Sequence, residues 1–349
     1  MNQTATTPPY IKETLNYLKF VLIILVVYAH SKPETAGNFK TFNMVQEVIT
    51  YNLCAIAVPL LFLLSGYLFF REGTLNKELY VKKLKKRFKT LVIPYIFWTL
   101  AAVFVILVVA QRYLPNLFTG SFPNISTFKA KDWLDVFWIE PLQYQFWYLR
   151  DLFVTILLTP LIYLFIKKIG VFFLLGLLVL LLARLSEPIV GFSVSSIFYF
   201  SIGAFFAIKN IDFVKLSDKY FIPVTIIYAA LFVVSVMVKN SNPLNFSVLV
   251  FMILPGMSFI TGLVYRCRAC FRKVPEVFYS STFFLYAFHG LFIMGLVRLL
   301  SKVGFVSTDI KTVVLYLIAP IITIIVSVLI YKVLIKIAPR FTKFITGGR

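Results

Sequence analysis

The chain contains only two histidines, and both lie in apolar runs. His30 ends a run that starts at Asn16, and His289 lies in a run over residues 280–300. An ionisable side chain inside a membrane span is energetically costly, so it marks a functional site by default. A neutral imidazole can take a proton from a hydroxyl group, which is the work of a general base. The alternative is that each histidine only hydrogen-bonds a neighbouring helix.

A basic stretch precedes the third apolar run and offers a site for a polyanion. Residues 82–89 contain Lys86, Arg87 and Lys89, and Pro94-Tyr95 follows. An arginine can bind phosphate through two parallel hydrogen bonds, whereas a lysine acts as a solvated point charge. We therefore predict that Arg87, with Lys86 and Lys89 beside it, binds phosphate groups on the cytoplasmic side. Ordinary anchoring of a span by cytoplasmic cations is the alternative.

Polar residues also open the fourth apolar run, at Phe146-Trp-Tyr-Leu-Arg-Asp151. Asp151 could orient an imidazole, as the carboxylate of a catalytic triad does. Trp147 and Arg150 are candidates for substrate binding, with Arg150 contacting an anionic group. An interfacial aromatic belt with a local ion pair would explain the same residues without catalysis.

The second apolar run contains a proline and a Ser-Gly pair. Pro59 removes an intrahelical hydrogen bond and can open a kink. Gly66 allows another helix to approach closely. Ser65 is a candidate substrate ligand, although helix packing alone also explains the pair.

These candidate residues need elements that hold them inside a bilayer. The chain has 349 residues, 60% of them hydrophobic, with a mean hydropathy of +0.88. One spanning helix needs about 20 apolar residues, and continuous runs exclude the alternating strands of a membrane barrel. We predict an all-α polytopic domain over residues 15–335, between cytoplasmic tails 1–14 and 336–349. The ten predicted spans are 15–31, 48–70, 90–110, 147–166, 170–185, 192–208, 221–238, 247–265, 280–300 and 312–335.

The basic residues indicate how the chain is oriented. The net charge is +21, and most of the 35 Lys and Arg fall in loops that share one side if both termini are cytoplasmic. The positive-inside rule therefore explains the charge, and no nucleic-acid partner is expected. With this orientation His30 lies about 22 Å and His289 about 14 Å from the inner ends of their helices, so about 8 Å separate them in depth.

Several other site classes find no support in the sequence. The chain contains no P-loop, dinucleotide fingerprint, zincin motif or hydrolase elbow. Cys267-Arg-Ala-Cys270 lacks the second pair of ligands that zinc needs, so we expect no metal. The first run resembles a signal peptide in part, but cleavage would remove His30, and we predict a retained helix. The loop 111–146 contains two tryptophans and mixed charges, which suits an interfacial helix or a cap over a cavity.

Taken in order, the polar residues resemble the motifs of the acyltransferase-3 family of membrane acyltransferases. Two positions depart from the family's pattern: Asn16 stands in place of an acidic residue, and Lys89 stands near the place of a second arginine. The resemblance extends from about residue 14 to residue 292. The matching residues are Asn16, Lys19 and His30 in the first run, Phe62–Gly66 in the second, Arg87–Tyr95 in the third, and Ser281 or Thr282, Tyr286 and His289 in the ninth.

The resemblance implies transfer of an acyl group, often acetyl, from cytoplasmic acyl-CoA to a hydroxyl of an extracytoplasmic glycan or lipid-linked saccharide. Acyl-CoA would be the co-substrate, its phosphates meeting Arg87 and its lysines. His30 and His289 would be catalytic, and Tyr286 would contact substrate. Transfer could be direct, with His30 as general base, or pass through an acyl-histidine. The expected location is the inner cell membrane, with the lipid bilayer as surroundings.

Two rival functions fit the same composition. A glycan or lipid transporter would also use many spans, a proline-kinked helix and buried polar groups, although no inverted repeat is visible. A sensor or scaffold would need no solvent-accessible tunnel that reaches His30.

Overall fold

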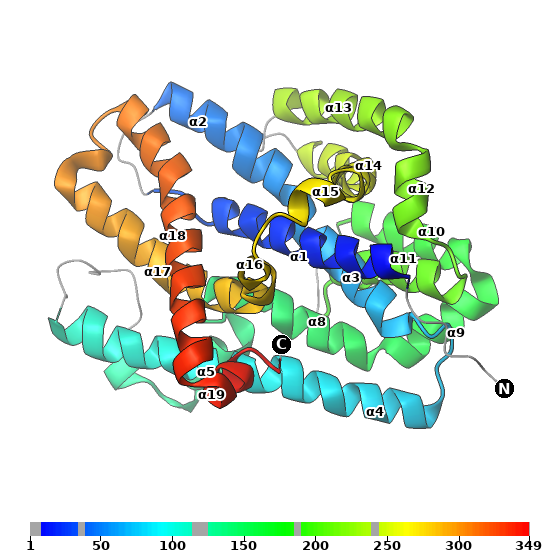
Figure 1. The fold of residues 1–349 in the computed structure, drawn as a ribbon, viewed down its shortest axis with the longest axis horizontal. Coiled ribbons are helices and arrows are strands. Elements are labelled where there is room, and N and C mark those ends of the chain that lie inside the picture. The colour runs from blue at the N-terminus through cyan, green and yellow to red at the C-terminus, as the bar shows by residue number, and fades with distance from the viewer. Residues whose placement is uncertain (1–7, 34–38, 114–124, 185–189, 239–243, 349) are drawn as a thin grey trace.

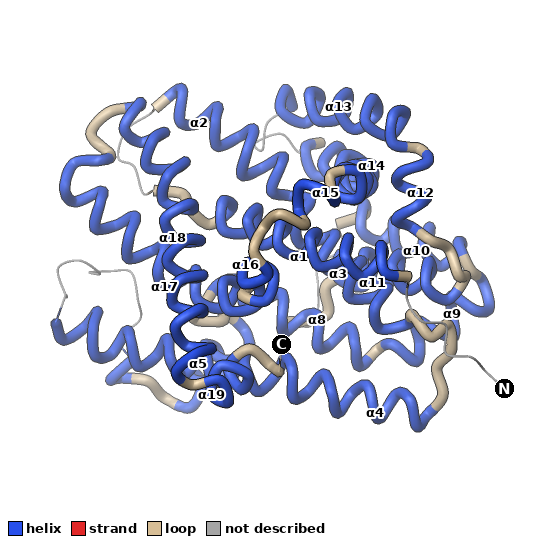
Figure 2. Tube along the Cα trace, in the orientation of Figure 1, coloured by secondary structure: helices blue, strands red, loops and turns tan. Residues whose placement is uncertain are grey.

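The computed structural model describes residues 8–348 apart from 34–38, 114–124, 185–189 and 239–243. Throughout these described ranges the backbone is helical or loop, and none of it forms a strand (Figure 2). The all-α prediction is confirmed. Helices are expected here because a helix satisfies its own backbone hydrogen bonds in a lipid environment.

The helices follow one another with short connections (Figure 1). The first half of the chain forms α1 (Pro9–Ala29), α2 (Lys40–Gln46), α3 (Ala57–Phe70), α4 (Lys77–Arg87), α5 (Ile93–Val105), α7 (Ala130–Leu134), α8 (Trp147–Leu157), α9 (Thr159–Ile169) and α10 (Val171–Leu182). The second half forms α11 (Val194–Ile208), α12 (Phe213–Lys219), α13 (Phe221–Val238), α14 (Asn245–Arg266), α15 (Arg268–Phe271), α16 (Glu276–Ser280), α17 (Thr282–Leu300), α18 (Asp309–Ile337) and α19 (Pro339–Ile345). Shorter π-helical or 3₁₀ segments join several of them, at Glu47–Leu53, Cys54–Ile56, Phe88–Val92, Ile106–Tyr113, Ile125–Thr127, Asp135–Ile139, Tyr144–Phe146 and Ser301–Phe305.

Fewer helices than predicted are long and apolar enough to cross a membrane. Each predicted span contains a helix, but the described helices that meet this condition number six, or eight if two bent pairs each count as one span. A multi-pass membrane protein is supported, while ten spans and cytoplasmic termini stay predictions. The helices that meet it alone are Lys40–Phe70, Lys77–Val108, Phe221–Val238, Asn245–Arg266, Thr282–Phe305 and Asp309–Ile337.

Local sequence explains the two bent pairs. Between α8 and α9 the direction changes by 61°, and Pro160 stands at the start of α9. A proline disfavours helical geometry in the residue before it, so one helix ends there. Between α11 and α12 the bend is 96°, and Asn210 adopts a positive φ of 54°. Asparagine is among the residues that tolerate this left-handed conformation at a helix end.

Helix α1 lies at the centre of the fold. It crosses the middle of the molecule in Figure 1 and contacts α3, α14, α17 and α18. Ten of its side chains are buried, including Leu18, Leu22 and Val27. The first helix is therefore enclosed by helices from both halves of the chain, which fixes the position of His30 at its end.

Glycines bring α3 and α11 into close contact. A Cβ atom added at Gly66 would lie 2.0 Å from the carbonyl oxygen of Phe200, and one at Gly203 would lie 1.9 Å from that of Leu63. Both helices thus approach backbone to backbone, as small residues allow in membranes. The packing interpretation of Ser65-Gly66 is confirmed for Gly66.

The helix that leads into α3 is irregular where the proline predicted a kink. Its turns are π-helical over Glu47–Leu53 and 3₁₀ over Cys54–Ile56, and regular geometry resumes just before Pro59. Proline removes one backbone hydrogen bond and crowds the carbonyl four residues earlier, which lies in this irregular stretch.

The described parts of both predicted tails are largely helical. Helix α1 begins at Pro9, inside the predicted tail 1–14. At the other end, α19 packs against α5, where the indole Nε1 of Trp98 donates a hydrogen bond to the Ile345 carbonyl at 2.9 Å. Gly347, with a φ of 69°, continues against the backbone of Thr90. The C-terminal residues are therefore part of the packed structure.

Candidate active site

The structure brings the two histidines together. His30 caps the C-terminal end of α1, and His289 lies in the middle of α17. Their ring centroids are 5.7 Å apart with an interplanar angle of 27°. His289 is fully buried, whereas His30 keeps part of its surface exposed. The structure thus places the two imidazoles side by side, and His30 is the more exposed of the two.

Hydrogen bonds fix the tautomer of His289. Its Nδ1 lies 2.8 Å from the carbonyl oxygen of Tyr286 and 3.2 Å from that of Leu285. A carbonyl oxygen only accepts, so Nδ1 must carry the proton and Nε2 the lone pair. Nε2 is buried without a partner among the described residues. The histidine bonds its own helix rather than a neighbouring one, and a bare basic nitrogen remains beside His30.

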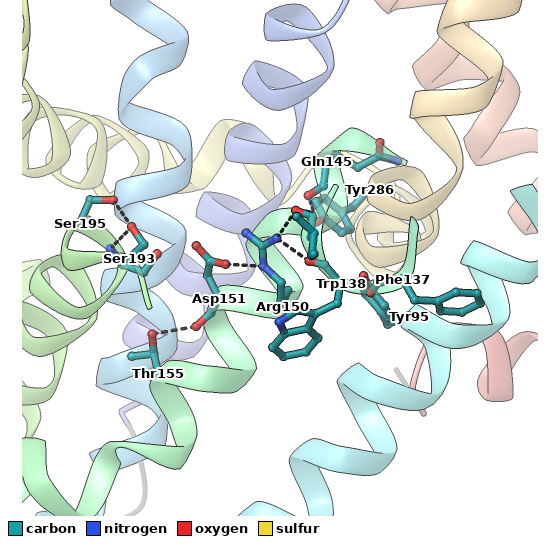
Figure 3. A network of polar contacts seen from close by, with 12 residues as sticks. Tyr95, Phe137, Trp138, Gln145, Arg150, Asp151, Thr155, Ser193, Ser195 and Tyr286 are labelled. Carbon is teal, nitrogen blue, oxygen red and sulfur yellow. Dashed lines mark hydrogen bonds and ion pairs between the residues drawn. The ribbon is translucent and has the colours of Figure 1, made fainter. Parts of the chain in front are cut away.

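The segment before α8 forms one wall of this histidine pair. The ring of Tyr144 lies 4.4 Å from that of His30. The backbone carbonyl of Gln145 accepts a hydrogen bond from the Tyr286 hydroxyl at 2.6 Å, as Figure 3 shows. The Gln145 side chain packs on Gly290, where a Cβ would lie 2.4 Å from its amide oxygen. Gly290 thus makes room for a buried amide next to His289.

Two buried amides extend this wall toward α5. Gln145 donates to the side-chain oxygen of Gln143, and Gln143 donates to the Trp98 carbonyl, each at 2.8 Å. The amide oxygen of Gln145 has no partner within the described ranges. Sequence reasoning missed both glutamines. The available signal was the presence of two amide side chains directly before an apolar run.

Asp151 is held by its neighbour rather than by an imidazole. Its carboxylate accepts a hydrogen bond from Arg150 Nε at 2.8 Å, and both side chains are largely buried. Arg150 also donates to the carbonyls of Trp138 and Ile139, at 2.7 and 2.9 Å (Figure 3). The arginine therefore attaches the end of the segment Asp135–Ile139 to α8. This is the local ion pair that the sequence offered as the alternative.

A cavity of about 690 Å³ opens beside the first half of α1. This volume falls within the ~300–1,000 Å³ usual for small-molecule sites. Its exposed end, which we call the mouth, carries Glu13, Arg272 and Glu276, and its inner end carries the buried Leu64, Leu152 and Tyr286. The full lining is Glu13, Asn16, Tyr17, Lys19, Ile23, Leu61, Leu64, Ser65, Leu68, Arg87, Leu91, Tyr148, Leu149, Leu152, Arg272, Val274, Glu276, Tyr279, Ser280, Thr282, Phe283 and Tyr286.

The predicted cations behave differently at this cavity. Arg87 lines it, and within the described residues no hydrogen bond or ion pair engages its guanidinium. Lys86 and Lys89 are exposed and are not among the lining residues. At the mouth, burial raises the pKa of Tyr279 to about 12, so its hydroxyl stays protonated and donates to the Phe271 carbonyl.

Tyrosines separate the cavity from the histidines. Tyr286 and Tyr148 line the inner end, and the Tyr148 hydroxyl lies 3.3 Å from that of Ser65. The ring of Tyr286 is 6.1 Å from that of His289, and neither histidine belongs to the cavity lining. Ser65 and Tyr286, both predicted to contact substrate, line the cavity. Trp147 lies one residue from Tyr148, with its ring 6.4 Å from that of Phe62.

Comparison with known protein families identifies the chain. A family model described as an acyltransferase domain, of the acyltransferase-3 family, matches residues 12–332. The chain belongs to this acyltransferase family. The match begins within α1 and continues almost to the end of α18. It includes the cavity-lining residues and both histidines. The resemblance seen in the motifs is confirmed, and so is the assignment as an acyltransferase.

One curated relative is named after the biosynthesis of a polysaccharide. The chain is 29% identical over 228 residues to the succinoglycan biosynthesis protein ExoH of Rhizobium meliloti strain 1021. The aligned stretch covers 63% of this chain and 60% of the length of ExoH. No solved structure matches the chain significantly.

Proposed function

We propose that the protein moves an acyl group, in the simplest case acetyl, from cytoplasmic acyl-CoA to a hydroxyl of an extracytoplasmic glycan or lipid-linked saccharide. The observation that carries this proposal is the histidine pair: a partly exposed imidazole beside a second one whose Nε2 lone pair is free. Membership of an acyltransferase family supplies the reaction class, and the succinoglycan relative supports a saccharide acceptor. The inner cell membrane is the location that a cytoplasmic thioester requires.

The cavity suits the donor. Its mouth is charged and its inner end apolar, so phosphates would stay at Arg87 while the acyl arm enters between α1, α3 and α8. From Ile23, the last lining residue of α1, seven residues lead to His30, a rise of about 10 Å. The arm must pass Tyr286 and Tyr148 to cover this distance, so these side chains move when the donor binds.

The transfer step balances without a metal or a redox group. The acceptor oxygen attacks the thioester carbonyl, the carbon–sulfur bond breaks, and an ester forms. The acceptor proton goes to His30, and the departing thiolate recovers a proton to give free CoA. His289 can share the proton held by His30, because the two rings are one small rotation or one water apart.

The alternative chemistry uses an acyl-histidine. Here His30 itself attacks the thioester, and the acceptor hydroxyl then displaces the acyl group from the ring nitrogen. Labelled acetyl-CoA supplied without acceptor separates the two paths, because only the second leaves hydroxylamine-sensitive label on the protein. Both paths need His30.

The testing experiment uses the purified full chain in lipid nanodiscs with labelled acetyl-CoA and lipid-linked saccharides extracted from membranes. We expect His30→Asn to lower the acylation rate by about 10²–10⁴-fold, the usual contribution of general acid–base catalysis. Lys168→Gln is the control, since this exposed lysine lies at the end of α9, away from the cavity lining. Undiminished acylation by His30→Asn would refute the proposal. A defect confined to saccharide export, measured with the same variants in sealed vesicles, would favour a transporter.

A further inference from the structure

A cation at the cavity mouth is held by a partner that a bound anion can replace. Arg272 follows α15 and donates from Nη2 to Glu13 on α1 at 2.8 Å. The side chains of Arg272 and Glu13 keep 59% and 34% of their surface exposed. Water screens an exposed ion pair of this kind, so it is weak and exchanges readily.

Basic side chains from three separate elements line the same cavity. Arg87 comes from the end of α4, Lys19 from α1 and Arg272 from the loop that precedes α16. Two carboxylates, Glu13 and Glu276, share the mouth with them. The formal balance favours an anion, and Arg272 is the cation nearest to solvent.

We propose that Arg272 binds a phosphate group of the acyl donor together with Arg87, and that Glu13 occupies Arg272 when no donor is bound. The inference rests on the proposed function, because it takes acyl-CoA as the donor. CoA carries a ribose 3′-phosphate and a pyrophosphate at separate positions, so two arginines on different elements match it better than two on one turn. An arginine binds such groups through a planar pair of donors.

Arg272 would thereby supply the second arginine that the sequence lacks near Lys89. Lys89 is exposed and lies outside the cavity lining, so it cannot supply the second cation from that position. The two arginines that precede Arg272, at the end of α14 and the start of α15, have other partners. Arg266 bonds Asp218 at 2.6 Å, and Arg268 stacks on the ring of Tyr265 at 3.7 Å.

The exchange of partners makes two opposite predictions. Arg272→Gln removes a charge-assisted contact, so the Kd for CoA should rise roughly tenfold. Glu13→Gln removes the competing carboxylate, so the Kd should fall roughly two- to fivefold, the range expected for one exposed ion pair. A gain of affinity cannot arise from misfolding, which protects the test against damaged protein.

The experiment is calorimetric titration of the full chain in nanodiscs with CoA and with 3′-dephospho-CoA. Arg268→Gln is the matched control, because it removes the same charge from the neighbouring helix α15, outside the cavity lining. If Arg272→Gln raises the Kd for CoA but not for 3′-dephospho-CoA, Arg272 binds the 3′-phosphate. If it raises both Kd values equally, Arg272 binds the pyrophosphate. Either result supports the inference. If Arg272→Gln and Glu13→Gln bind CoA like the wild type, the inference is overturned while the proposed function stands. If the wild type binds no CoA, both are wrong.

Discussion

At the scale of single residues, the proposed chemistry depends on the pairing of His30 with His289. His289 donates its Nδ1 proton to a carbonyl of its own helix, and its Nε2 is left bare. Burial keeps this nitrogen from water, so its free lone pair is available only to groups inside the site. In the proposed function, the more exposed His30 meets the acceptor, and the buried His289 lies behind it.

Asp151 gives a residue-scale prediction that separates positioning from catalysis. Because Asp151 bonds Arg150, and Arg150 bonds two carbonyls near Trp138, we expect Asp151→Asn to preserve the geometry and to keep the acylation rate within a few-fold of wild type. Where a carboxylate orients a catalytic imidazole, the same change lowers the rate by roughly 10⁴. Steady-state kcat of the reconstituted protein measures the difference.

Asp151→Ala extends that test to stability. It leaves the largely buried Arg150 without its charged partner, which costs about 3–5 kcal/mol for a buried pair. The thermal midpoint in detergent should fall, and the double change Arg150→Met with Asp151→Leu should recover part of the loss. An unchanged midpoint for Asp151→Ala would show that the pair does not attach the segment Asp135–Ile139 to α8.

At the scale of elements, the contact between α3 and α11 supports the part of the cavity lining that contains Ser65. We expect Gly66→Ala to lower the free energy of unfolding by about 3 kcal/mol or more, because its Cβ would meet the Phe200 carbonyl at 2.0 Å. Gly176→Ala on α10 is the matched control, since no atom lies within 4 Å of that Cβ. Alanine there should be neutral or stabilising, by about 0.5–1 kcal/mol at most.

Thermal unfolding of both variants in detergent measures this contrast. If Gly66→Ala has the same thermal midpoint as the wild type, α3 and α11 do not pack backbone to backbone at this position. Equal destabilisation by Gly176→Ala would point to a general intolerance of substitutions in these helices.

The elements also show which features the sequence could predict. Each predicted apolar run contains a helix, and the Ser65-Gly66 pair predicted a close helix contact, since both depend on local composition. Helices such as α4 and α19 lie outside these runs. Bends were not predictable, because Pro160 and Asn210 end helices only where the neighbouring packing permits a change of direction. Ten predicted spans compare with six to eight described helices or bent pairs that are long and apolar enough to cross a membrane, so the number of spans stays a prediction.

At the scale of the whole molecule, the site joins residues that are far apart in the chain. Helix rise alone placed His30 and His289 about 8 Å apart in depth, and only the structure shows that their rings lie side by side. Arg87, which was predicted to bind phosphate, lines the cavity. Arg272 and Gln145 were missed because their positions depend on tertiary contacts, with Glu13 and with Gly290. A loop arginine looks like an ordinary cytoplasmic anchor until the helices close around it.

The proposed function includes a direction for the reaction. The cavity mouth lies at the end of α1 that holds Glu13, and His30 lies at the other end. In that proposal, donor and acceptor approach these two ends from opposite faces of the membrane. This separation distinguishes the proposed reaction from acylation of a substrate that shares the donor's compartment.

The most direct test of this direction uses sealed vesicles that contain the protein in one orientation, with labelled acetyl-CoA inside and a membrane-impermeant saccharide acceptor outside. Transfer across the membrane predicts acetylated acceptor outside while acetyl-CoA remains enclosed, and no product with His30→Asn. Product that forms only when donor and acceptor are placed on the same side would contradict the proposed function.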